Sequence, residues 1–88
     1  MPPKYYTVKA NGHLFFFTYE KDYPDLLHIF ARHTREPADA IGLFFGGAIT
    51  TWNEQCQRFE TTDFVETIYW IWLDQAKKKV LIISCFRN

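Results

Sequence analysis

The sequence predicts an α+β fold, in which an N-terminal β-hairpin and four later strands form a mainly antiparallel sheet with two consecutive helices packed on one face. Asn11-Gly12 separates two β-prone segments, and this pair is the strongest short hairpin signal because a type I′ turn needs positive φ at both central residues. Residues 24–45 have helical periodicity, and β-branched and aromatic runs follow Gly47. The expected order is ββααββββ, in one domain spanning residues 1–88.

The first hairpin is predicted over residues 5–10 and 13–19. A two-residue loop sets the register, so the expected cross-strand pairs are Ala10–His13, Val8–Phe15 and Tyr6–Phe17. These pairs share one strongly aromatic face of the hairpin. His13 is expected to lie at the turn, exposed to solvent.

Two helices are expected next. The first runs from about Pro24 to Thr34, since proline suits the first position of a helix. Its buried stripe is expected to hold four residues spaced i, i+3, i+4 and i+7: Leu26, Ile29, Phe30 and His33. Pro37 begins the second helix, and Gly46-Gly47 ends it.

Four strands are expected after the helices, over residues 48–53, 55–61, 65–73 and 80–86. The last of them, VLIISCF, is almost entirely apolar and β-branched, which is typical of a strand in the middle of a sheet. The polar segment before it, residues 74–79, contains three consecutive lysines and is predicted to be a loop.

Composition excludes several classes of function. Ten basic and ten acidic residues give zero formal charge, which argues against a protein whose main task is to coat nucleic acid. Two cysteines without a CxxC motif argue against a disulfide framework or a structural zinc site. The N-terminus lacks the apolar segment of a signal peptide, and no apolar run approaches 18 residues. We therefore expect a soluble cytoplasmic protein that does not enter a membrane.

The segment LLHIFARHTRE, residues 26–36, gathers the most potential chemistry. Helical spacing places His28, Arg32 and Arg35 on one face, and His33 about a third of a turn away on the apolar stripe. One interpretation is a solvated charged face with a core histidine. The other is that His33 lies where helix meets sheet, with its pKa tuned toward neutrality, and that the arginines bind phosphate.

A second group of polar residues lies on the predicted strands. It comprises Arg58, Glu60, Thr61, Thr62, Tyr69 and Arg87. Arg87 is either a solubilising end of the chain or a side chain that reaches the helix. The histidines at 28 and 33 are five residues apart, which does not match the i, i+4 pair that binds metal on one helix face. No metal or cofactor is expected.

Two segments, HIFARH at 28–33 and IISCFR at 82–87, resemble those of small bacterial ribonuclease toxins, the broad RelE-like, BrnT-like and colicin-D-like group. The resemblance implies RNA as substrate and an antitoxin protein as partner. It also implies His33 as the acid/base, Arg32 and Arg87 as phosphate ligands, and Tyr69 or Thr62 as supporting groups. We add His28, Arg35 and Arg58 as candidate substrate-binding residues.

The first hypothesis is therefore a metal-independent ribonuclease toxin. The alternative is a non-enzymatic interaction module, such as a phage or plasmid accessory protein, an inhibitor or an obligate homodimer. Zero net charge and the 19% aromatic content favour this alternative. A non-catalytic RNA or DNA binder is a third hypothesis.

Overall fold

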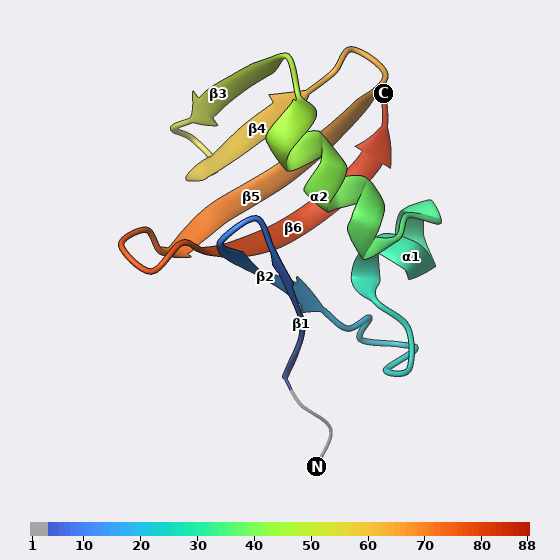
Figure 1. Cartoon of the computed structure of the whole chain (residues 1–88). Helices are drawn as coiled ribbons and strands as arrows, with labels where there is room; N and C mark the ends of the chain where they lie inside the picture. The colour runs from blue at the N-terminus through green and yellow to red at the C-terminus, as the bar shows by residue number, and fades with distance from the viewer. Residues whose placement is uncertain (1–3) are drawn as a thin grey trace.

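The computed structural model describes residues 4–88, which form a six-stranded sheet and two helices (Figure 1). The predicted α+β class and element order are confirmed. The elements are β1 (Tyr5–Ala10), β2 (His13–Thr18), α1 (His28–His33), α2 (Pro37–Gly46), β3 (Ile49–Asn53), β4 (Arg58–Thr62), β5 (Glu66–Asp74) and β6 (Lys79–Arg87). In this part of the chain, no helix has the length and apolar character needed to cross a membrane.

The strands lie in the order β1-β2-β6-β5-β4-β3, which makes the sheet mixed rather than wholly antiparallel. Strand β2 pairs with β6 in parallel, and the other four neighbouring pairs are antiparallel. The prediction that the last strand is central is confirmed, because β6 lies between β2 and β5. Its apolar sequence suits that place, since Val80, Ile82 and Cys85 are fully or almost fully buried.

The first hairpin has the predicted register, with Tyr6 opposite Phe17, Val8 opposite Phe15, and Ala10 opposite His13. Asn11 and Gly12 have φ values of 49° and 77°, which the predicted turn requires. Phe15 and Phe17 are buried, so this register directs the aromatic face of β2 into the core. His13 is half-buried instead of exposed, because its ring packs against Phe44 and Phe45 of α2.

The first helix is shorter than predicted, because residues 24–27 are not helical. Tyr23 to Leu26 form a turn closed by a 2.9 Å hydrogen bond from the Leu26 N–H to the Tyr23 carbonyl. Leu27 is extended and bridges to Tyr19, so α1 begins at His28. Pro24 thus lies in a turn and does not begin the helix. Thr34 ends the helix in the left-handed region, with φ of 56°.

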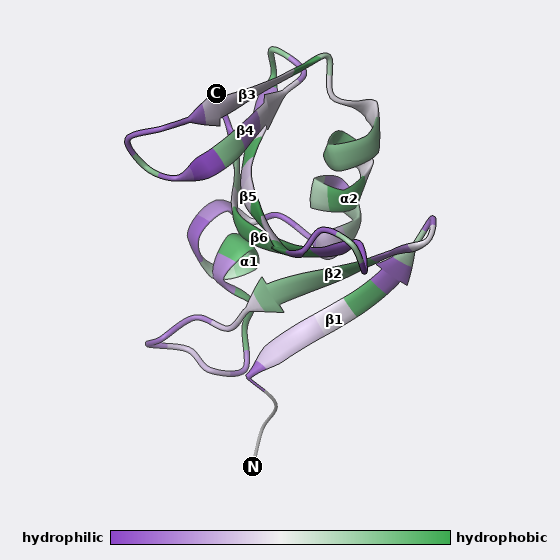
Figure 2. Ribbon diagram, turned by 90° about the vertical axis from the view of Figure 1, so that its left-hand side faces the viewer, coloured by the Kyte–Doolittle hydropathy of each residue, from purple (hydrophilic) through white to green (hydrophobic). Residues whose placement is uncertain are grey.

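The second helix forms as predicted, with Pro37 at its start. The backbone N–H of Glu36 donates to the Asp39 carboxylate at 2.8 Å, which is half of a capping box. Ala40 and Leu43 are buried against the sheet, in the core built around Phe15, Ile68 and Trp70. The predicted packing of both helices on one face is not confirmed: α2 lies across β4, β5 and β6, whereas α1 packs mainly against β6 (Figure 2).

Candidate functional site

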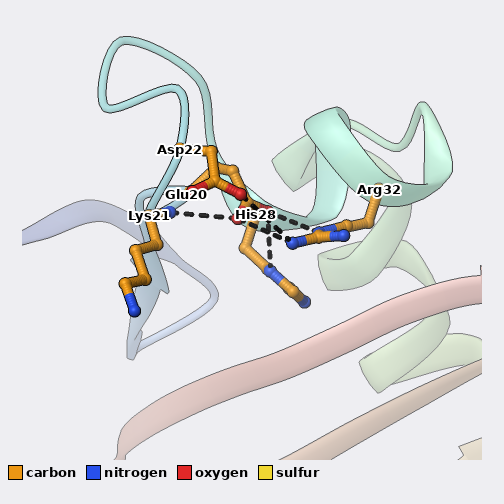
Figure 3. A network of polar contacts seen from close by, with 5 residues as sticks. All are labelled: Glu20, Lys21, Asp22, His28 and Arg32. Carbon is orange, nitrogen blue, oxygen red and sulfur yellow. Dashed lines mark hydrogen bonds and ion pairs between the residues drawn. The ribbon is translucent and has the colours of Figure 1, made fainter.

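The side chains of α1 converge on a buried carboxylate, that of Glu20, which is 4% exposed (Figure 3). Arg32 donates to it twice, from Nε at 2.8 Å and from Nη2 at 3.1 Å. His28 Nδ1 lies 3.2 Å from the second carboxylate oxygen, and the backbone N–H of Lys21 donates to the first at 3.0 Å. The carboxylate therefore has a partner for each oxygen, as a buried charge requires.

The local fold brings Glu20 to α1. Its backbone N–H donates to the Leu26 carbonyl at 2.8 Å, so residues 20–26 fold back beside the helix. The Arg32 guanidinium is the main reason that the pKa of Glu20 falls to about 2, and the pKa of Arg32 is raised in turn. The sequence pattern does not reveal Glu20, because its pairing with Arg32 twelve residues later depends on this loop and not on helical spacing.

His33 is exposed, so its predicted place on the buried stripe is wrong. Because α1 has only six residues, Ile29 alone is buried, and Leu26 and Phe30 are each 38% exposed. The His33 ring packs against the Phe86 ring at 5.7 Å between centroids and lies 6.3 Å from the His28 ring. Partial desolvation at this contact, followed by the nearby His28, Arg32 and Arg35, lowers the pKa of His33.

A row of side chains continues from His33 across the sheet. Phe86 is followed by Tyr69, with 4.9 Å between ring centroids, and the Arg58 guanidinium lies 3.5 Å above the Tyr69 ring. Arg58 Nε also donates to Glu60 at 3.0 Å. Since side chains alternate along a strand, Tyr69 and Phe86 lie on the face opposite the buried Ile68 and Cys85.

The other predicted site residues lie outside this row. Arg35 forms an ion pair with Glu66 at 2.6 Å and so connects the end of α1 to β5. The Thr62 hydroxyl donates to the Glu66 carbonyl and accepts from the Phe64 N–H, so it holds the β4–β5 turn. Arg87 is exposed at the end of β6, in register with Glu66, and has no ion pair among residues 4–88.

The structure therefore joins part of the predicted site and separates the rest. His28, Arg32 and His33 lie together, and Phe86 connects them to Tyr69 and Arg58. Arg32 and His28 were assigned to a solvated face by one interpretation, yet both bind Glu20, although Arg32 stays 55% exposed. Within the described residues, no three His, Cys, Asp or Glu side chains are grouped as metal ligands would be.

Comparisons with protein-family models, with curated proteins and with solved structures found no match for this chain.

Proposed function

We propose that the protein is a metal-independent ribonuclease in which His28 and His33 act as an acid–base pair. One observation carries the proposal: two imidazole rings lie 6.3 Å apart at the surface, and one of them is anchored to a buried carboxylate. Cleavage of RNA without a metal needs one group to remove the 2′-hydroxyl proton and a second to protonate the leaving oxygen. Two imidazoles at this separation can reach both sides of one phosphodiester.

The roles follow from the surroundings of each ring. His33 has a lowered pKa, which favours its neutral form, so it serves as the base that takes the 2′-hydroxyl proton. The 2′-oxygen then bonds to phosphorus while the bond from phosphorus to the 5′-oxygen breaks. His28 is held through Nδ1 by Glu20, which leaves Nε2 to deliver a proton to that 5′-oxygen. The products are a 2′,3′-cyclic phosphate and a 5′-hydroxyl.

Arg32 and two aromatic rings near the pair fit the rest of the substrate. Arg87 alternates with Phe86 along β6, so it lies on the opposite face of the sheet from the His33–Phe86 contact and is left out of this site. Arg32 offers only the part of its guanidinium that is not bound to Glu20. Phe86 and Tyr69 are half-buried, and the accessible part of these rings would contact an unpaired base, which favours single-stranded RNA.

The test is cleavage of a single-stranded RNA by the purified protein in the presence of EDTA. We expect His28→Ala and His33→Ala each to lower the rate by about 10²-fold or more, and the fragments to carry cyclic phosphates. His13→Gln is the matched control, because His13 packs beside α2, away from the pair. Circular dichroism would confirm that each variant is folded. Full activity of both alanine variants, or loss of activity in EDTA, would contradict the proposal.

The pH dependence provides a second measurement on the same protein. Because the pKa of His33 is lowered, its protonation should reduce kcat/KM only below about pH 6.5, the ordinary histidine value. If kcat/KM instead rises with pH through a midpoint above that value, His33 is not the base.

A non-enzymatic interaction module is the second candidate, and two observations favour it. Arg32, Arg35 and Arg58 are each paired with a carboxylate, which reduces the local charge available to a phosphate backbone. Phe64 and Val65 in the β4–β5 turn are 70% and 55% exposed, and exposed apolar residues side by side are typical of contact surfaces. Intact RNA after incubation with micromolar protein across the pH range of histidine titration would favour this candidate.

A further inference from the structure

The sheet ends in two edge strands, β1 on one side and β3 on the other (Figure 1). Within residues 4–88, β3 pairs with β4 alone, so backbone N–H and C=O groups along its outer side have no strand partner. Four of its five residues are exposed. An edge of this kind is a template for another strand unless side chains prevent pairing.

The two edges differ in their protection. Strand β1 carries Lys9 and follows Lys4, and lysine on an edge strand opposes pairing with another chain. Strand β3 has the sequence ITTWN, without a charged residue or a proline. Its Ile49 and Trp52 are each 44% exposed. Its β-branched and aromatic residues are those that stabilise strand pairing.

We infer that β3 is a self-association edge, at which two copies of the chain pair antiparallel about a two-fold axis through Thr51. Thr51 then lies opposite Thr51 of the second copy, Thr50 opposite Trp52, and Ile49 opposite Asn53. The first acidic residue beyond the strand, Glu54, lies opposite Ala48. No charged residue faces a like charge, and an antiparallel pair of identical strands gives the closed symmetry usual for dimers.

Charge does not oppose the pairing of β3 with β3 of a second copy. The edge is neutral and the whole chain has zero formal charge, so two copies do not repel each other. The contact joins two six-stranded sheets into one. A five-residue strand provides much less area than a standard interface of about 1,600 Å², so we expect a dissociation constant on the order of micromolar.

The first experiment is size-exclusion chromatography with light scattering over a series of protein concentrations. We expect the parent protein to shift from monomer to dimer through the micromolar range, and Thr51→Lys to remain monomeric because two lysines would meet at the axis. Thr7→Lys places the same charge at an exposed position of the other edge and should dimerise like the parent. A parent that stays monomeric at the highest concentration, or a Thr51→Lys variant that dimerises normally, would overturn the inference.

The second experiment does not depend on the folding of the lysine variant. Thr51→Cys in a Cys56→Ser background removes the other exposed thiol and places one cysteine at the axis. Mild oxidation should then produce a covalent dimer, because cross-strand Cβ atoms at the axis come within reach of a disulfide. Thr7→Cys in the same background is the control. Equal cross-linking of both variants would show that the dimer does not form through β3.

Discussion

The two helices are neighbours in the chain, yet different forces position them. Helix α2 has ten residues and buries Ala40 and Leu43 against the sheet, so apolar burial fixes it. Helix α1 has six residues and one buried side chain, Ile29. Such a short helix is not stable alone, and ion pairs from its residues and from Arg35 hold it to Glu20 and Glu66. The candidate site thus lies on the helix that buries one apolar side chain and is joined to the rest of the fold by ion pairs.

The largest expected effect tests the apolar half of this comparison. Leu43→Ala removes a side chain that is 6% exposed under α2 and should lower the free energy of unfolding by about 2–5 kcal/mol. Phe30→Ala on α1 truncates a side chain that is 38% exposed and should cost about 1 kcal/mol or less. Urea unfolding measures both. Equal losses would show that α1 is as firmly packed as α2.

A smaller effect is expected where α2 meets β4. At Gly47 an added Cβ would lie 2.3 Å from Thr61 Cγ2 and 2.7 Å from the Leu43 carbonyl oxygen. Gly47→Ala should therefore destabilise the fold by about 1–3 kcal/mol. Gly46→Ala is the matched control, because a Cβ there meets no atom within 4 Å. It should be neutral or slightly stabilising, as alanine favours helix. A neutral Gly47→Ala would mean that the contact with β4 is loose.

The smallest expected effect tests the ion pairs between α1 and Glu20. Glu20→Gln should lower the urea midpoint at neutral pH and increase hydrogen exchange in α1. The pKa of Glu20 is about 2 in the fold against an ordinary 4.5, so the folded state binds this proton less readily than the unfolded state. The carboxylate therefore stabilises the fold above pH 4.5, and this contribution is lost as the pH falls toward 2.

The difference between Glu20→Gln and the parent should follow that pH window and disappear at its acidic end. Asp25→Asn is the control, since Asp25 is exposed in the same loop. A pH-independent difference would show that the side chain acts through packing rather than through its charge.

Much of the fold could be predicted because the signals are local. Asn11-Gly12 specifies the first turn and its register, and Pro37 begins α2 through its fixed φ. The apolar sequence of residues 80–86 identified the central strand. The candidate site was predicted only in part, because helical spacing places His28 and Arg32 on one side of α1 but does not show what they contact.

Only the tertiary structure decided the features that depend on distant residues. The parallel pairing of β2 with β6 joins residues 65 positions apart, such as Leu14 and Lys79, and no local pattern encodes it. The bridge between Tyr19 and Leu27 keeps Leu27 extended, so α1 begins only at His28. The buried carboxylate of Glu20 then binds Arg32 and His28. His33 is left exposed against Phe86, since a six-residue helix buries one position and not a full stripe. Local propensity thus determined which elements form, and long-range contacts determined which side chains meet.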